Sequence, residues 1–215
     1  MTNIATHTPI TFSWPRPRTK AWAHKWEHKL VLAVFFSFLV ALGVNIKIYL
    51  PFTPVPITLQ TFFVLLSGML LGTRWGGFSI ALYLGMGTVF PESFFSGAGI
   101  ATYGYLGGFF IYAILADKIY KKCQFYRTDQ QKNCFANSNF VSFTIIPIAR
   151  STVLFLLVLL TVYLPGVWWL KFSLNLDYYS ALQLGLFPFM LGEVIKIFAG
   201  VLLMQKLEQI PIINR

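Results

Sequence analysis

The chain has 215 residues, of which 56% are hydrophobic and only 11% are charged, and its net charge is +10. Because soluble domains carry roughly 25% charged residues, this composition excludes an ordinary soluble protein and indicates that lipid surrounds part of the surface. The basic residues lie in short segments between apolar runs, which is the pattern of membrane topology and not of nucleic-acid binding.

The N-terminal segment, residues 1–29, is polar and basic, and we expect it to form a cytoplasmic tail. It differs from a secretory signal because the apolar run that follows is too long and no small-residue cleavage site appears. Residues 30–204 are expected to form one all-α integral membrane domain, a compact bundle of six transmembrane helices. The predicted spans are Leu30–Leu50, Ile57–Gly72, Trp75–Phe90, Ile100–Ala116, Phe143–Leu164 and Leu184–Met204.

Three connections separate these spans in characteristic ways. A proline-rich break, PFTPVP at residues 51–56, follows the first span, since proline disfavours helix. The polar segment Asp117–Asn139 is predicted to be a loop, and Pro165–Ala181 is predicted to be an aromatic-rich loop at one membrane interface. The short segment 205–215 is expected to be a C-terminal tail.

The distribution of positive charge predicts the orientation. With the N-terminus in the cytoplasm, thirteen of the seventeen Lys and Arg residues fall in inside segments and only Lys47 and Lys171 fall outside. Arg150 and Lys196 lie within spans, and Arg150 is close enough to the cytoplasmic end to reach the headgroups. This asymmetry indicates an even number of spans with both termini cytoplasmic.

Two charged residues lie deep within the last predicted span. Glu193 and Lys196 are three residues apart, so a helix places them on one face. Charges inside a membrane are costly, and two interpretations are open: an ion pair that lowers the insertion cost, or a polar site for a small ligand. Tyr83 and Tyr105 are candidates for a cavity wall or for helix packing, because a hydroxyl buried in lipid needs a partner.

Ala33, Ser37 and Ala41 form a stripe of small residues, four apart, that permits close approach of another helix. Neither a phosphate-binding loop nor paired carboxylates occur within the spans, and all three histidines lie in the N-terminal segment. We therefore expect no enzymatic activity, no metal, no cofactor and no ATP hydrolysis by this chain.

Four stretches together resemble one known family. PFTPVPITLQTFFVLLSGMLLG, TYGYLGGF, YLPGVWWL and GLFPFMLGEVIK are similar to the BioY biotin transporters, the substrate-binding (S) components of energy-coupling factor (ECF) transporters. The resemblance implies high-affinity biotin binding near the extracellular side. It also implies uptake with a transmembrane coupling protein and two ATPase subunits, in a bacterial cytoplasmic membrane.

The resemblance also assigns residues. It implies a biotin site formed by Glu193, Lys196, Gln60, Tyr83 and Tyr105. It further implies that the small-residue stripe on the first helix contacts the coupling protein. The family usually carries Asp at the position of Glu193, and its PTGGY motif reads ATYGY here.

Biotin carries two ureido N–H donors, a carbonyl acceptor and a carboxylate on its tail. A carboxylate such as Glu193 suits the N–H groups, whereas Lys196 suits either the carbonyl or the ligand carboxylate. Two alternatives remain open: an S component for another vitamin, and a membrane scaffold that transports nothing.

Overall fold

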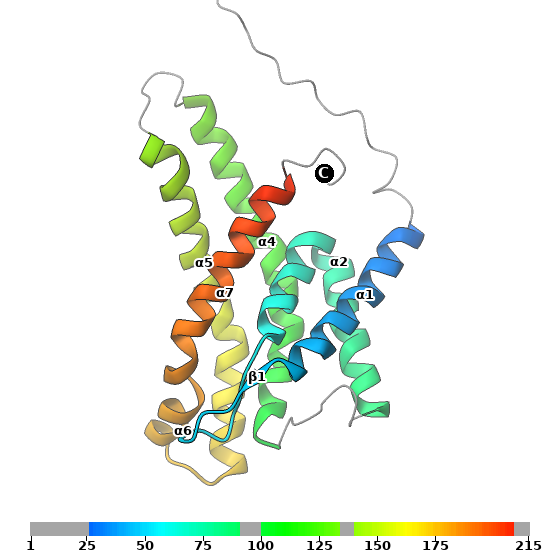
Figure 1. Cartoon of the computed structure of the whole chain (residues 1–215), viewed down its shortest axis with the longest axis vertical. Coiled ribbons are helices and arrows are strands. Elements are labelled where there is room, and N and C mark those ends of the chain that lie inside the picture. Colours follow the sequence, from blue (N-terminus) through cyan, green and yellow to red (C-terminus); the bar gives the residue numbers. More distant parts are fainter. Residues whose placement is uncertain (1–25, 91–99, 134–139, 209–215) are drawn as a thin grey trace, which may run out of the picture.

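The computed structural model describes residues 26–90, 100–133 and 140–208, and these are almost entirely helical (Figure 1). The elements are α1 (Trp26–Asn45), β1 (Lys47–Ile48), β2 (Ile57–Thr58), α2 (Gln60–Val89), the 3-10 helix η1 (Ile100–Thr102), α4 (Tyr103–Asn133), α5 (Phe140–Ser173), α6 (Tyr178–Gly185) and α7 (Phe187–Glu208). Within the described ranges, four stretches are long and apolar enough to cross a membrane: Trp26–Asn45, Gln60–Val89, Ala149–Ser173 and Tyr178–Leu207. The chain is therefore a helical membrane protein.

The α2 helix is interrupted at Gly72, whose φ of 83° lies outside the helical region and is readily adopted only by glycine. A Cβ atom added at Gly76 would lie 2.9 Å from the Cα atom of Gly68. In a continuous helix eight residues span about 12 Å, so the chain folds back on itself at the break. The break falls between the second and third predicted spans, as the sequence predicts.

A buried carboxylate fixes this turn. Asp117 of α4 accepts hydrogen bonds from the backbone N–H of Thr73 at 2.8 Å and from its hydroxyl at 2.6 Å. The same oxygen, Oδ2, forms an ion pair with Lys121 at 2.7 Å. Asp117 thus holds the start of the second half of α2 against α4.

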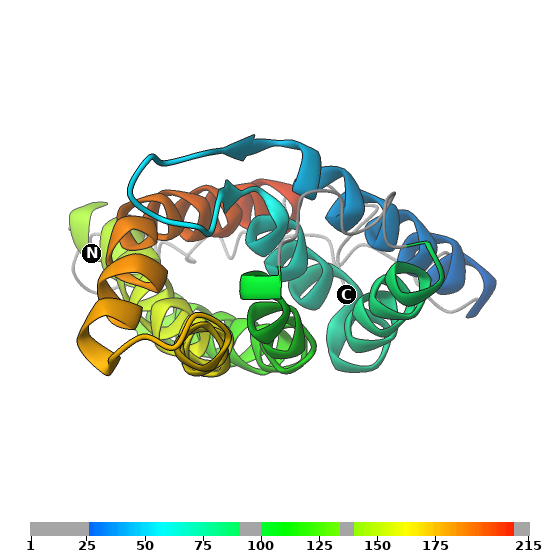
Figure 2. The ribbon, with the colours of Figure 1, turned by 90° about the horizontal axis from the view of Figure 1, so that it is seen from below.

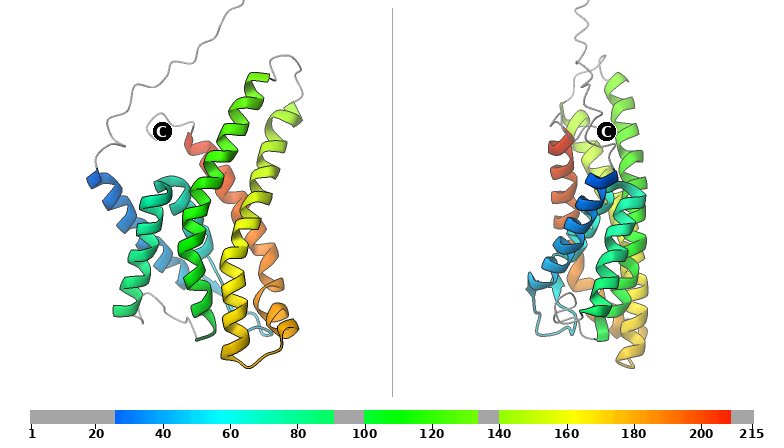
Figure 3. Two further views of the ribbon diagram at one scale, coloured as in Figure 1. Left: turned by 180° about the vertical axis from the view of Figure 1, so that it is seen from behind. Right: turned by 90° about the vertical axis from the view of Figure 1, so that its right-hand side faces the viewer.

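The helices lie in two layers. In Figures 2 and 3, α1 and α7 lie on one side, while α4, α5 and the second half of α2 lie on the other. The start of α1 and the end of α7 lie at the same end of the bundle, and α6 lies at the opposite end (Figure 1). The core between the layers contains side chains from α2, α4 and α5, including Leu65, Met69, Tyr112 and Phe155.

The first connection differs from the prediction. α1 ends at Asn45 rather than at Leu50, because Lys47–Ile48 pairs antiparallel with Ile57–Thr58 in a small two-stranded sheet. The proline-rich segment is the loop of this hairpin, where prolines cannot interrupt any ladder. α2 accordingly begins at Gln60.

Two predicted loops are largely helical instead. α4 continues from the fourth predicted span through most of Asp117–Asn139, where polar side chains suit a helix that extends beyond the apolar layer. α5 continues past Pro165 to Ser173, and α6 begins at Tyr178, before the predicted end of this loop. Membrane helices tolerate proline when neighbouring groups satisfy the freed carbonyl, so Pro165 was a poor end signal.

Candidate ligand-binding site

A cavity lies between the β1–β2 hairpin and the helices around it. The space between its walls is about 630 Å³ when the open solvent at the mouth is counted, and the room for centres of water-sized spheres is about 60 Å³. Its wall is contributed by the end of α1, the hairpin, the start of α2 and parts of α4, α5 and α7. The lining side chains are Val44, Lys47, Val55, Pro56, Thr58, Gln60, Thr61, Thr102, Tyr105, Leu106, Phe109, Val162, Tyr163, Phe189 and Glu193.

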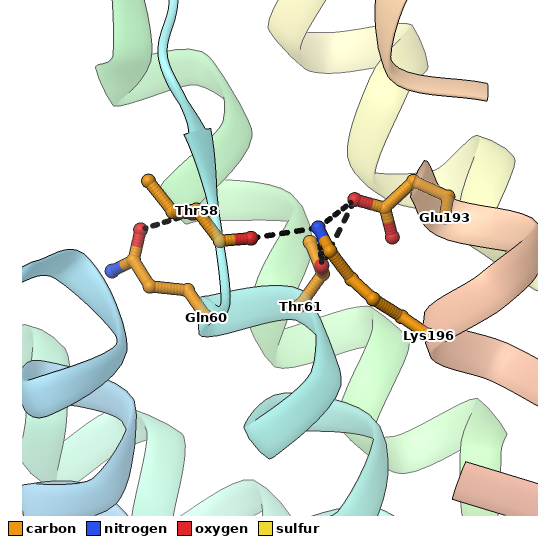
Figure 4. A network of polar contacts seen from close by, with 5 residues as sticks. All are labelled: Thr58, Gln60, Thr61, Glu193 and Lys196. Atoms are coloured by element: carbon orange, nitrogen blue, oxygen red, sulfur yellow. Dashed lines mark hydrogen bonds and ion pairs between the residues drawn. The ribbon is translucent and has the colours of Figure 1, made fainter. Parts of the chain in front are cut away.

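Glu193 and Lys196 form the charged centre of one wall. Their side chains are 3% and 11% exposed and form an ion pair at 2.7 Å. Lys196 also donates to the carbonyl of Thr58 at 2.7 Å and to the hydroxyl of Thr61 at 3.1 Å (Figure 4). A lysine ammonium has three N–H donors, so these three acceptors match its full capacity.

The Glu193 carboxylate keeps room for a further donor. Its Oε1 atom accepts from Lys196 at 2.7 Å and from the hydroxyl of Thr61 at 3.0 Å. Both of these hydrogen bonds fall on one oxygen, and a carboxylate offers about four lone-pair positions. Oε2 therefore has acceptor capacity for a ligand N–H group, since Glu193 lines the cavity.

The local backbone explains why Thr58 and Thr61 reach α7. β2 ends at Thr58 and α2 begins at Gln60, so the chain turns sharply between them. The N–H of Leu59 is within hydrogen-bonding distance of the carbonyls of Gly43 and Ile46, 3.2 Å from each, which fixes the turn against the end of α1. The Thr58 carbonyl and the Thr61 hydroxyl then face α7, as Figure 4 shows.

Gln60 and Tyr83 form a second polar contact on the other side of this turn. The Gln60 amide donates to the Tyr83 hydroxyl at 2.7 Å, and both side chains are buried. Gln60 lines the cavity, whereas Tyr83 lies behind it and is not among the lining residues. Tyr83 is thus placed to orient the Gln60 amide rather than to meet a ligand.

Three aromatic side chains, Tyr105, Tyr163 and Phe189, also line the cavity. Tyr105 packs edge-on against Tyr163 with 5.6 Å between ring centroids, and Tyr163 lies 6.2 Å from Phe189. The Tyr105 hydroxyl donates to the Gly185 carbonyl at 2.9 Å, which satisfies it without a ligand. A Cβ atom at Gly166 would lie 2.3 Å from the Tyr105 ring, so only glycine leaves room for this ring there.

The structure brings Gln60, Tyr105 and Glu193 together on the cavity wall, with Lys196 and Tyr83 directly behind it. Sequence reasoning did not identify Thr58, Thr61, Tyr163 or Phe189. Thr61 lies in the stretch PFTPVPITLQTFFVLLSGMLLG, but no spacing rule links it to a helix more than 130 residues later. Arg150, predicted to reach the headgroups, is exposed on α5.

The small-residue stripe is not an exposed surface. Ala33 and Ser37 are fully buried and Ala41 is 7% exposed. α1 packs chiefly against α2, so the helix that approaches the stripe closely belongs to the same chain. The contact of this stripe with a coupling protein stays a prediction.

Among the described residues, no cluster of three or more His, Cys, Asp or Glu side chains is arranged to hold a metal ion. The site instead presents a buried acceptor, a neutralising cation and an apolar aromatic wall. This combination suits a small ligand with N–H donors and an apolar ring, because each buried polar group then finds a partner.

Three relatives and one solved structure resemble the chain. The biotin transporter BioY of Thermotoga maritima is 28% identical over 194 residues, 86% of this chain and 98% of that protein. A probable biotin transporter BioY of Pyrococcus horikoshii is 28% identical over 182 residues, 82% of this chain and 94% of that protein. The probable biotin transporter BioY of Lysinibacillus sphaericus is 45% identical, but over 91 residues that span 40% of this chain and 45% of that protein.

The fold is similar to the crystal structure of the S-component for biotin from an ECF-type ABC transporter. The TM-score is 0.63 at 21% identity, over 84% of this chain and 90% of the other. This likeness shows that the two chains share a helical fold. The profile of the BioY family matches residues 17–211, nearly the whole sequence, and the chain therefore belongs to the BioY family.

Proposed function

We propose that this protein binds biotin and carries it across the membrane as the substrate-specific component of an ECF-type transporter. The observation that carries the proposal is the buried Glu193 carboxylate on the wall of an aromatic-lined cavity, in a chain of the BioY family. Biotin transporters of this family are its relatives along most of its length. The protein acts as a binding and transport subunit, not as an enzyme.

In the proposed complex, one ureido N–H group of biotin donates to Oε2 of Glu193. Lys196 holds the carboxylate in place through Oε1, because its donors are engaged by Glu193, Thr58 and Thr61. The apolar ring of biotin packs against Tyr163 and Phe189. Tyr105 and Gln60 complete the wall, and Tyr83 orients Gln60.

We further propose six membrane crossings with both termini in the cytoplasm of a bacterial cell. The two halves of α2 then cross separately, so that α1, both halves of α2, α4, α5 and α7 supply the six spans. The start of α1 and the end of α7 lie at one end of the bundle, which supports an even number of crossings (Figure 3). Residues 1–29 and 205–215 are the cytoplasmic tails, and residues 30–204 the binding domain.

The proposal includes a coupling protein and two ATPase subunits as partners that supply the energy for transport. We place the contact with the coupling protein on the outward face of α1, which exposes Val31, Phe35 and Leu42. Exposed apolar side chains of this kind suit a helix–helix contact within the membrane or a lipid surface.

The test is equilibrium binding of labelled biotin to the purified chain in detergent, with competition by unlabelled biotin and by other water-soluble vitamins. Saturable binding that only biotin displaces is the expected result. Displacement by a different vitamin would identify an S component with another substrate. Absence of binding to every vitamin in the panel would favour a scaffold and refute the proposed function.

A further inference from the structure

The proposed site accounts for the N–H groups and the ring of the ligand but not for its carboxylate. Moving a carboxylate from water into a largely apolar cavity is unfavourable unless a cation meets it. Lys196 does not fill this role, because its three donors are matched by acceptors of the chain and it does not line the cavity.

A second lysine does line the cavity. Within the described residues, the wall carries two charged side chains, Glu193 and Lys47. Lys47 lies in β1 directly after α1 and pairs with Thr58 of β2. Glu193 lies across the β2–α2 turn on α7, so the two charges belong to different walls of the same cavity.

Lys47 also stands at the boundary between the cavity and the outside. Its side chain is half-buried, and its Nζ atom lies 5.5 Å from the ring of Tyr49, which is 65% exposed. A lysine in this position can cover apolar wall with its methylene stem and keep its ammonium at the mouth. A ligand carboxylate at the mouth would stay near water while it meets a positive charge.

The two walls differ in their net charge. Glu193 is neutralised by Lys196 at 2.7 Å, and its acceptor oxygen repels a ligand carboxylate while it attracts N–H donors. Lys47 attracts a ligand carboxylate and disfavours N–H donors. The charges therefore favour one orientation of a ligand that has donors at one end and an anion at the other.

We propose that Lys47 forms an anion subsite at the mouth of the cavity, which binds the carboxylate of the ligand and so fixes its orientation. The inference rests on the proposed function, since it assigns a role for the tail of the same ligand. It predicts selection for biotin over analogues whose tail is neutral.

The experiment compares biotin with biotinamide, in which a neutral carboxamide replaces the carboxylate, by isothermal titration calorimetry on the purified full chain in detergent. The wild-type protein should bind biotin about tenfold more tightly than biotinamide, as expected for one charge-assisted hydrogen bond. Lys47→Met should remove this preference by weakening biotin alone. Lys47→Arg, which keeps the charge, should retain most of it.

The matched control is Lys171→Met, which removes the other lysine predicted to lie outside. Lys171 lies 3.9 Å from the Tyr178 ring centroid and does not line the cavity, so the preference should be unchanged. Unchanged biotinamide affinity in Lys47→Met shows that the variant is folded.

Two results would overturn the subsite while leaving biotin as the ligand. They are equal wild-type affinity for the two compounds, and a preference that survives in Lys47→Met. A wild-type protein that binds neither compound would overturn the proposed function itself, and the subsite with it.

Discussion

Replacing Lys196 by methionine tests how the buried charge of Glu193 is tolerated. The substitution keeps the length and apolar stem of the side chain but removes all three N–H donors. The Glu193 side chain, only 3% exposed, would keep the Thr61 hydroxyl but lose its countercharge. Removal of one partner from a buried ion pair costs about 3–5 kcal/mol. For chains of this size we therefore expect the midpoint of thermal unfolding to fall by roughly 6–20 °C.

The assay is thermal unfolding of the purified chain in detergent without ligand. The control Lys206→Met removes an exposed lysine from the last turn of the same helix and should leave the midpoint within about 2 °C of wild type. Joint replacement of Glu193 by leucine and Lys196 by methionine should recover most of the lost stability, because apolar substitutes for a buried pair are often neutral. The reasoning is refuted if Lys196→Met unfolds at the wild-type temperature, or if the double variant is no more stable than Lys196→Met.

Three further predictions concern the ligand, α1 and the topology. Glu193→Gln loses the charge and half of the acceptor capacity, so it should weaken biotin binding by about tenfold or more. Glu193→Asp should weaken binding less. Wild-type affinity in Glu193→Gln would place the ligand elsewhere. Ala33→Trp should lower the unfolding temperature because Ala33 is fully buried. Leu32→Trp, at a 48% exposed position, should not lower it. Equal stability of the two variants would contradict the packing of Ala33 inside the chain. In a cysteine-free background, Lys122→Cys should react only with reagent inside the cell and Lys171→Cys only with reagent outside, and external labelling of Lys122→Cys would exclude six spans with both ends inside.

Long apolar runs made the membrane class and the main helices predictable. The break in α2 was also predictable, because Gly72 and Arg74 interrupt the apolar run that forms this helix. Helix ends were predicted less well, since hydropathy locates the apolar layer and not the helix. α4 therefore extends beyond its predicted end at Ala116. In this extension Lys121 forms an ion pair with Asp117, one helical turn earlier.

The part of the site that lies on α7 was predictable from the sequence. Glu193 and Lys196 stood out because a charge in an apolar run is costly and their spacing places them on one face. The partners of Lys196 on the β2–α2 turn could not be found in this way, since a backbone carbonyl has no signature in the sequence. The burial of Ala33 was also hidden, because a small-residue stripe permits close packing without specifying which helix packs against it.

The contacts of Lys196 also bear on the order in which the protein becomes functional. Its hydrogen bonds join residues 138 and 135 positions apart in the chain, from the first third of the sequence to the last helix. During synthesis the hairpin and the first half of α2 enter the membrane long before α7 exists. At that stage the Thr58 carbonyl and the Thr61 hydroxyl have no bond to Lys196, and the Glu193 carboxylate is absent from the cavity. Capture of the ligand is consequently a property of the finished chain, and a nascent or C-terminally truncated product would not compete for it.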